Sequence, residues 1–230
     1  MSGVSNSVAQ FVIGFIMFAA GAAVFSLLNV IIYRLPKDRP TGKGRSRIRC
    51  ALIDVLGGMI SVILTFKYGF TLRTLTIFLF FCVITVIAFI DFDTLKIPPV
   101  LNVCVFILGV ISIRTLGNAG IADRIIGMFA ISVPMLIVAV IVPGGFGGGD
   151  IKLMFAAGFL LGLKSTVAAF VIGLLTGAVY GIWLMITRRQ NKKGHFAFGP
   201  FLCLGMAIAL FWGDRLADWY IRCFMGIVTK

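Results

Sequence analysis

The chain has 230 residues, of which 60% are hydrophobic, with a mean hydropathy of +1.09 and a formal net charge of +13. Soluble domains are roughly 45–50% apolar, so this composition and its recurring apolar runs exclude an ordinary soluble fold. Lys and Arg fall between the runs, where they commonly fix membrane topology, and nucleic-acid binding is therefore not indicated. We expect an all-α polytopic membrane protein.

Eight apolar segments are candidates for transmembrane helices, since a span needs about 20 apolar residues or somewhat fewer inside a bundle. In chain order they are residues 8–33, 51–66, 75–90, 100–113, 125–142, 153–163, 167–186 and 196–212. The sixth is about half of a usual span. It is interpreted either as a half-helix or as a segment that continues through Ser165 into a tight bend.

The distribution of basic residues predicts the orientation of these helices. If the N-terminus lies outside, 13 Lys and Arg fall in cytoplasmic connections and 8 outside, which together make the 21 of the chain. This excess favours an N-terminus and a C-terminus that both face the outside.

Residues 144–149 contain five glycines in six positions and precede Asp150. Glycine loses much backbone freedom in a helix and has no side chain to pack, so the helix is predicted to break here. Broken backbone near hydrocarbon is tolerated where protein shields it or where it faces water. We therefore expect the loop to line a wet pocket with Asp150 at its rim; the alternative is a flexible connector with a solvated aspartate.

The acidic residues of the chain are eight aspartates, with no glutamate. Asp91 follows the third apolar segment and Asp150 follows the fifth, so two intervening helices bring both to the cytoplasmic face. Asp93 is a secondary candidate because it neighbours Asp91, and Asp54 is another because it lies in the second segment. The aspartates expected to be ordinary solvated charges at the outside are Asp123, Asp214 and Asp218.

Two carboxylates that share one water can cleave an amide. The ionised one takes a proton from the water and the protonated one hydrogen-bonds the carbonyl oxygen, and close like charges share one proton. Asp150 begins a helix and Asp91 ends one, so the helix dipoles predict Asp150 as the base and Asp91 as the acid. Lys152 is interpreted as an interfacial anchor, or as a ligand of a substrate carbonyl.

Four sequence blocks stand out: GGGDIKL at residues 147–153, Asp91 with Ile97-Pro98, FGPF at residues 198–201 and LNVIIYRLP at residues 28–36. Together they resemble the type IV prepilin peptidases, which are membrane aspartyl proteases of the GxGD class. Residues 147–153 (GGGDIKL) are similar to the family's G-x-G-D-[apolar]-K-L block. Asp91 and the pair Ile97-Pro98 are similar to its I-D-x5-I-P block, and this spacing selects Asp91 over Asp93. Residues 198–201 (FGPF) and 28–36 (LNVIIYRLP) resemble its late and early blocks.

The resemblance implies a GxGD-type aspartyl protease fold with Asp91 and Asp150 as catalytic residues. It also implies supporting roles for Gly147, Gly149, Lys152 and Pro98, and a division into an N-terminal membrane region (1–73) and a peptidase core (74–230). The implied substrates are type IV prepilins or type II secretion pseudopilins, cleaved at the cytoplasmic face of a bacterial inner membrane. Membrane lipid is the other expected partner, and proteolysis needs no cofactor.

Two features depart from the family pattern. Pro99 stands after Ile97-Pro98 where Asp or Asn is usual, which changes the turn. The loop of residues 37–49 is short and lacks the two CxxC pairs that bifunctional members carry, so no metal site is expected, and Cys50 alone cannot replace four zinc ligands. Residues 49–58 resemble the stretch after that loop, with Asp54 where Glu is usual. N-methylation of the mature pilin, with S-adenosylmethionine as cofactor, is therefore left open.

Three alternatives remain at this point. A cation-binding transporter would also use a broken helix and membrane-face aspartates, although the halves show no repeat. An archaeal-type preflagellin peptidase would keep the chemistry and change the substrate. A catalytically inert interaction subunit is the third.

Overall fold

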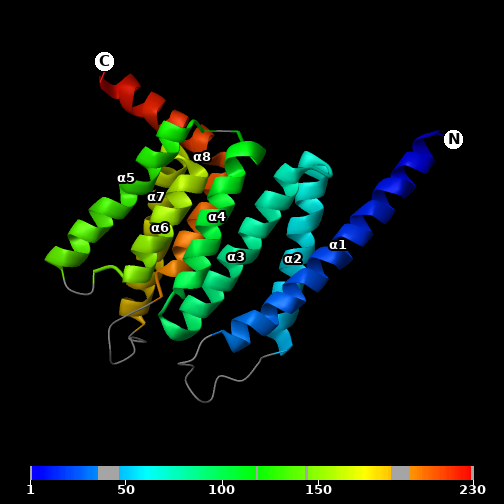
Figure 1. Ribbon diagram of the computed structural model, residues 1–230, viewed down its shortest axis with the longest axis horizontal. Coiled ribbons are helices and arrows are strands. Elements are labelled where there is room, and N and C mark those ends of the chain that lie inside the picture. The colour runs from blue at the N-terminus through cyan, green and yellow to red at the C-terminus, as the bar shows by residue number, and fades with distance from the viewer. Residues whose placement is uncertain (1, 36–46, 118, 143–144, 188–196, 229–230) are drawn as a thin grey trace. The chain divides into compact units, whose positions relative to one another are not determined.

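The computed structural model describes residues 2–35, 47–117, 119–142, 145–187 and 197–228, and these form eight α-helices (Figure 1). The helices are α1 (Ser2–Arg34), α2 (Arg47–Tyr68), α3 (Leu72–Thr94), α4 (Pro99–Thr115), α5 (Ile121–Ile141), α6 (Gly148–Leu161), α7 (Leu163–Ile186) and α8 (Gly199–Val228). Each contains most of one predicted apolar segment. The prediction of an all-α fold with eight helices is therefore confirmed.

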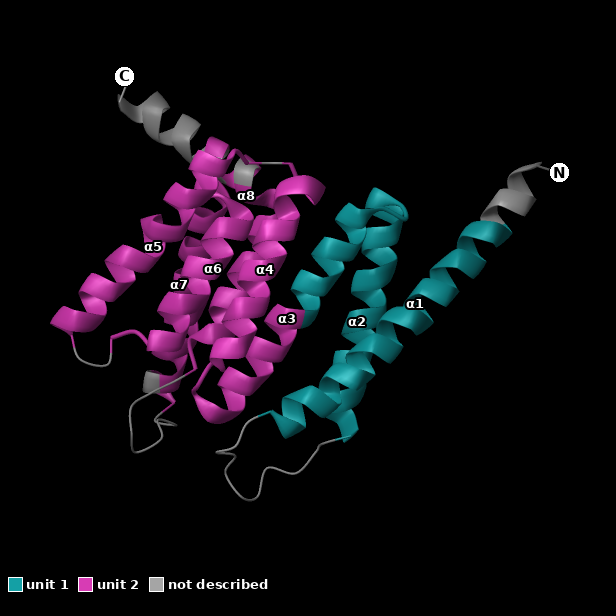
Figure 2. Cartoon of the chain, in the orientation of Figure 1, with its two compact units in different colours: residues 1–82 teal, residues 83–230 magenta. Residues whose placement is uncertain are grey.

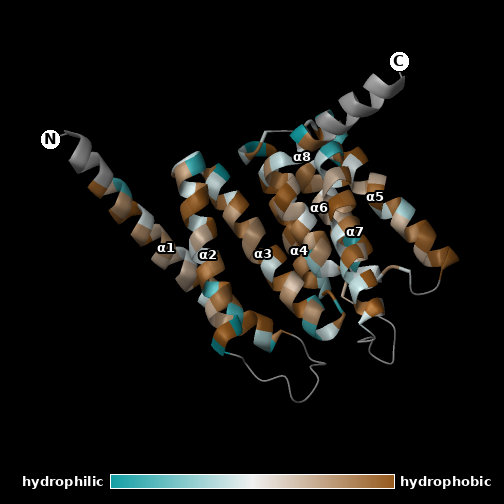
Figure 3. Ribbon diagram, turned by 180° about the vertical axis from the view of Figure 1, so that it is seen from behind, coloured by the Kyte–Doolittle hydropathy of each residue, from teal (hydrophilic) through white to brown (hydrophobic). Residues whose placement is uncertain are grey.

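Hydrophobic residues run along the helices, as Figure 3 shows. Among the described residues, five helices are long and apolar enough to cross a membrane: α1, α2, α3, α5 and α7. Residues 99–115 and the first half of α8, residues 199–213, are shorter apolar helices. The chain is therefore a multi-pass membrane protein.

The chain divides into two compact units, residues 1–82 and 83–230, which Figure 2 distinguishes by colour. Helix α3 begins in the first unit and ends in the second. This division rests on the contacts between residues. The expected boundary after residue 73 separates two regions by their functional roles, and it stays a prediction. The loop of residues 37–49, whose shortness bears on methylation, lies mostly outside the described residues.

In unit 1, glycines allow α1 and α2 to pack closely. A Cβ atom at Gly58 would come within 2.6 Å of the Phe18 ring, and one at Gly21 would lie 2.6 Å from the carbonyl oxygen of Gly57. Small residues at such crossings are typical of membrane helix pairs, because they let backbones approach. These glycines therefore pack the protein's own helices.

A polar contact in unit 1 joins α1 to α2. Asn29 is fully buried, and its Nδ2 donates to Oδ1 of Asp54 at 2.8 Å and to the carbonyl oxygen of Cys50 at 3.3 Å. The carboxylate of Asp54 thus has a partner within its own unit.

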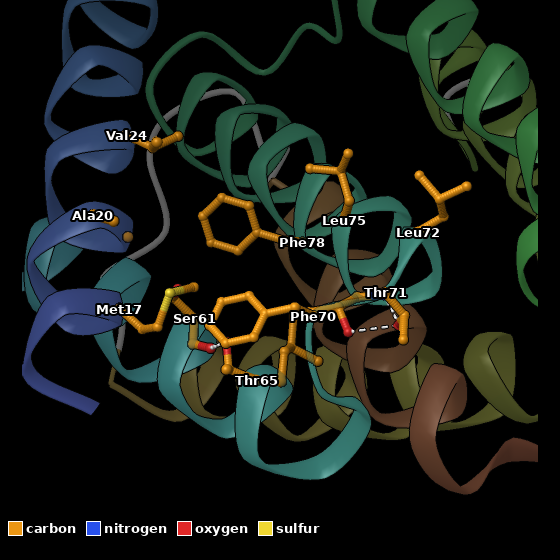
Figure 4. A pocket seen from close by; sticks show the side chains of 13 residues that line it. Met17, Ala20, Val24, Ser61, Thr65, Phe70, Thr71, Leu72, Leu75 and Phe78 are labelled. Atoms are coloured by element: carbon orange, nitrogen blue, oxygen red, sulfur yellow. Dashed lines mark hydrogen bonds between the residues drawn. The ribbon is translucent and has the colours of Figure 1, made fainter. Parts of the chain in front are cut away.

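A cavity of about 450 Å³ lies within unit 1, between α1, α2 and the start of α3 (Figure 4). Its walls are mainly apolar, with Met17, Phe70 and Phe78 among the lining residues. The hydroxyl of Thr65, also in the lining, donates to the Ser61 carbonyl of its own helix. The lining contains no ionisable side chain, so this cavity has no group for acid–base chemistry.

In unit 2, α6 packs against α4, α5, α7 and α8. It has 14 residues, or about 21 Å of helix, which is less than the hydrocarbon thickness of about 30 Å. Gly162 follows with φ +79° and α7 begins at Leu163. The half-helix interpretation is supported, and the alternative of a segment continuing through Ser165 is wrong.

Arg124 closes the C-terminal end of α6 and is fully buried. Its Nη1 donates to the carbonyl oxygens of Phe159 at 2.9 Å and Leu160 at 3.1 Å, and to Oγ of Ser112 in α4 at 2.6 Å. The last carbonyls of a helix have no intrahelical partner, so Arg124 satisfies groups that would otherwise be orphaned. Arg124 therefore lies inside the helix bundle, where it caps α6.

Asp123 also differs from its predicted role as a solvated charge. Its Oδ2 accepts a hydrogen bond from the backbone N–H of Leu163 at 3.2 Å, in the first turn of α7. A carboxylate is favoured there because the N-terminal N–H groups of a helix lack partners. Asp218 pairs with Lys164 at 2.8 Å, both about half exposed, and the side chain of Asp214 lies outside the described residues.

Candidate active site

Asp91 lies in the last turn of α3 and is 5% exposed. The helix ends after it because Leu95 takes a left-handed conformation, with φ +55°, and Pro98 and Pro99 follow. The backbone N–H of Gly199, at the start of α8, donates to Oδ2 of Asp91 at 2.9 Å. The first turn of α8 thus orients the Asp91 carboxylate.

Asp150 lies in the first turn of α6 and is 8% exposed. As predicted, the helix breaks at the glycines: α5 ends at Ile141 and α6 begins at Gly148. Oδ1 of Asp150 is buried and has no hydrogen-bond partner within the described residues. Asp150 therefore lies deeper than the open rim that the loop pattern predicted.

The two aspartates lie close enough for the charge of Asp91 to act on Asp150. The buried thiol of Cys203, in α8, lies near the carboxylates of both aspartates. Helices α3, α6 and α8 thus bring together the pair predicted to meet. In a low-dielectric interior two such carboxylates do not both ionise at little cost, so the arrangement suits one shared proton.

Three glycines keep side chains out of the space around the pair. A Cβ atom at Gly199 would lie 2.6 Å from Oδ2 of Asp91, and one at Gly147 would lie 3.0 Å from Oδ2 of Asp150. A Cβ atom at Gly149 would lie 3.0 Å from Cβ of Ile97. The GxGD segment therefore contacts Ile97 and the FGPF segment contacts Asp91, and each glycine stands where a larger residue would displace a neighbour.

Residues 78–182, which include both aspartates, match the family model described as the type IV leader peptidase family. This region of the chain is therefore similar to that family. Curated proteins named "Prepilin leader peptidase/N-methyltransferase" are similar over a longer stretch. The protein from Bacillus subtilis is 30% identical over 166 residues, which cover 70% of this chain and 64% of the relative.

Two further relatives with the same name extend this similarity. The protein from Aeromonas salmonicida is 29% identical over 195 residues, 80% of this chain and 67% of the relative. That from Legionella pneumophila is 28% identical over 188 residues, 77% of this chain and 64% of the relative. The chain thus spans about two thirds of the length of these leader peptidases. No solved structure matches it.

Of the other predicted site residues, some lie around the pair and some lie away from it. Pro98 is the N-cap residue of α4, next to Ile97, and Lys152 is exposed one turn into α6. Asp93 is buried and two residues beyond Asp91, so it points about 200° around α3 from it. Asp54 belongs to unit 1, where Asn29 binds it.

Pro99, the departure from the leader peptidase pattern, occupies the first helical position of α4. The backbone N–H at that position has no intrahelical acceptor, so a proline removes nothing the helix needs. The substitution thus leaves Ile97 in place against Gly149.

Asn102 was not among the predicted site residues. It is 6% exposed, and its Nδ2 donates to the carbonyl oxygen of Gly149 at 3.4 Å. Its Oδ1 is buried and has no partner within the described residues. A polar residue three positions after Pro99 in an otherwise apolar helix start was the only signal for it in the sequence.

Within the described part of the chain, no group of three or more His, Cys, Asp or Glu is arranged to hold a metal ion. In the same part of the chain, Cys82, Cys104 and Cys203 form no disulfide.

Proposed function

We propose that this chain is a membrane aspartic endopeptidase, with Asp91 and Asp150 as its catalytic residues. The observation that carries the proposal is the interacting pair of buried carboxylates, contributed by α3 and α6 inside the region that matches the leader peptidase family. Residues with this chemistry activate water by general acid–base catalysis and need no cofactor for hydrolysis.

In the proposed reaction, ionised Asp150 takes a proton from a water molecule as its oxygen forms a bond to the substrate's carbonyl carbon. Protonated Asp91 gives its proton to the carbonyl oxygen. On collapse, the C–N bond breaks, the proton held by Asp150 passes to the leaving amine, and Asp91 regains a proton from the hydroxyl. An amide and water thus become a carboxylic acid and an amine, and both aspartates return to their starting states.

The positions of the pair on their helices support this division of roles, with one opposing contact. Asp150 is in the first turn of α6 and Asp91 in the last turn of α3, so the dipoles favour charge on Asp150. The Gly199 N–H bond to Asp91 acts in the opposite sense, because such a donor stabilises a carboxylate. Infrared difference spectra of Asp91→Asn and Asp150→Asn identify the residue that holds the resting proton; a proton on Asp150 reverses the roles.

The proposed substrates are type IV prepilins or type II secretion pseudopilins, cleaved at the cytoplasmic face of a bacterial inner membrane. Relatives with 28–30% identity carry the name prepilin leader peptidase, and the excess of basic residues favours an outside N-terminus. Gly147, Gly149 and Pro98 are proposed to support the site and Lys152 to anchor α6 at the interface, while Asp93 and Asp54 take no part in cleavage.

A second activity, N-methylation, is named for the relatives. The tetracysteine loop of bifunctional prepilin peptidases is the feature associated with it, and here the sequence has Cys50 alone in that region. We propose that S-adenosylmethionine is needed only if this activity is retained.

The test is incubation of the purified full chain in detergent with a prepilin, with and without S-adenosylmethionine. Mass spectrometry then measures the shortened product and its N-terminal mass. Wild type is expected to remove the leader, while Asp91→Ala and Asp150→Ala do not. A methyl mass increment on the product would establish the second activity.

Asp218→Asn is the matched control, because it removes a carboxylate of the same unit from a half-exposed ion pair. It is expected to cleave at the wild-type rate. Cleavage that persists in Asp91→Ala or Asp150→Ala would exclude the aspartate pair, and absence of cleavage by folded wild type would exclude the proposed function.

A further inference from the structure

Asn102 provides a polar group that the two-aspartate reaction does not use. It stands in the first turn of α4, which begins at Pro99, and its side chain reaches α6. The contact is with the carbonyl oxygen of Gly149, the residue immediately before Asp150. Asn102 is therefore attached to the backbone that carries one member of the pair.

The orientation of the Asn102 amide follows from this contact. A carbonyl oxygen accepts hydrogen bonds, so the amide nitrogen faces Gly149 and the amide oxygen faces away from it. That oxygen, Oδ1, is buried and without a partner in the described residues. Buried acceptors are almost always paired, so Oδ1 requires a donor that the described chain does not supply.

Asp150, the residue after Gly149, also carries an oxygen that requires a donor. Its Oδ1 is also buried and without a partner. The site thus holds two buried acceptors that lack donors within the described residues: one on Asn102, which contacts Gly149, and one on Asp150, the residue that follows Gly149. A water molecule carries two O–H donors, and buried waters typically satisfy polar groups of this kind.

We propose that Asn102 is a third catalytic residue that holds the attacking water together with Asp150. One O–H of the water donates to Asp150, which removes that proton, and the other donates to Oδ1 of Asn102, which keeps it. This fixes the direction of the oxygen lone pair toward the scissile carbonyl. The inference rests on the proposed peptidase function and adds to it the group that orients the nucleophile.

The test uses the purified full chain with a prepilin and compares wild type, Asn102→Leu and Asn102→Asp. Leucine has a similar volume and no polar atom, so Asn102→Leu is expected to lower kcat roughly 100-fold, the effect of a misplaced nucleophile, with KM nearly unchanged. Ser132→Ala, which removes a buried hydroxyl of α5 bonded to its own helix, is the control and keeps the wild-type kcat.

Asn102→Asp separates water binding from simple support of Gly149. Both substitutions remove the amide donor to Gly149, but aspartate retains an acceptor for water. Asn102→Asp is therefore expected to retain more activity than Asn102→Leu. Its pH optimum is expected to lie higher than that of wild type, because an added negative charge opposes ionisation of the base. Equal loss in the two variants would overturn the proposal and leave Asn102 as a support for Gly149.

A measurement without substrate keeps this inference separate from the peptidase proposal. The infrared carbonyl band of the protonated carboxyl of the pair is expected to shift in Asn102→Leu and to stay in place in Ser132→Ala. An unchanged band, or a wild-type kcat in Asn102→Leu, would overturn the role of Asn102 even if wild type cleaves prepilin. If folded wild type does not cleave prepilin, the peptidase proposal fails. The shift of the infrared carbonyl band in Asn102→Leu then tests by itself whether Asn102 acts on the aspartate pair.

Discussion

The backbone N–H of Gly199 binds Oδ2 of Asp91 at 2.9 Å, although the two residues are 108 positions apart. The contact joins the start of α8 to the end of α3 and leaves no room for a side chain at position 199. It makes the FGPF segment part of the candidate aspartate site.

Gly199→Ala is expected to lower prepilin cleavage at least about tenfold, because the added methyl group displaces the Asp91 carboxylate. Gly120→Ala is the matched control: Gly120 also stands at the start of a helix, and a Cβ atom there meets nothing within 4 Å. Initial cleavage rates and thermal midpoints of both variants provide the comparison. A Gly199→Ala enzyme as active as Gly120→Ala would contradict this role of the contact.

The three glycines before Asp150 are expected to respond differently to alanine. Gly148→Ala should retain full activity, because nothing lies within 4 Å of its Cβ position. Gly147→Ala and Gly149→Ala should both lose activity, the first through Asp150 and the second through Ile97. Cleavage rates of the three variants, each checked for folding by its thermal midpoint, test this order; equal rates would count against it.

Arg124→Met is expected to destabilise the protein by about 3 kcal/mol, because buried carbonyls at the end of α6 lose their donor. Methionine fills similar space and cannot donate, so the orphaned acceptors remain. The thermal midpoint in detergent should fall by several degrees. Arg114→Met, at an exposed position of α4, is the control and should melt like wild type. Equal midpoints for the two variants would refute the capping role.

The rate of leader cleavage is expected to follow a bell-shaped pH profile. At low pH the base of the pair is protonated and cannot accept a proton from water, and at high pH the acid has lost the proton it must give. Measuring kcat/KM in buffers of constant ionic strength tests this, with Asp218→Asn as the control that keeps the wild-type shape. A profile with a single limb would mean that only one of the two aspartates titrates in the reaction.

The apolar pattern predicted the helices well because each run of hydrophobic residues is long and bounded by glycine, proline or charge. It failed to predict the length of α8, which continues to Val228 although the apolar run ends near Trp212. A helix satisfies its backbone locally and can extend beyond its apolar part, so hydropathy does not give its end.

The site was predictable where it depended on local motifs. Asp91 and Asp150 were found from their positions after apolar segments and from the GxGD and IP spacing. Asn102 was missed because its significance comes from contact with Gly149, 47 residues later, and from an acceptor left without a donor. Neither property is a feature of the sequence near residue 102.

The contacts of Arg124 also set an order for the biogenesis of the protein. The ribosome adds Phe159 and Leu160, whose carbonyls accept hydrogen bonds from Arg124, 35 and 36 residues after Arg124 itself. Until those residues emerge, the buried guanidinium of α5 lacks the two α6 carbonyls as acceptors, while Ser112 and Ala119, which also bind it, precede it in the chain. Because an unsatisfied charge is expensive in hydrocarbon, α5 gains its full stability in the bilayer only when α6 joins it. The two helices are therefore a single insertion step, and α6, the helix that carries Asp150 in its first turn, completes it.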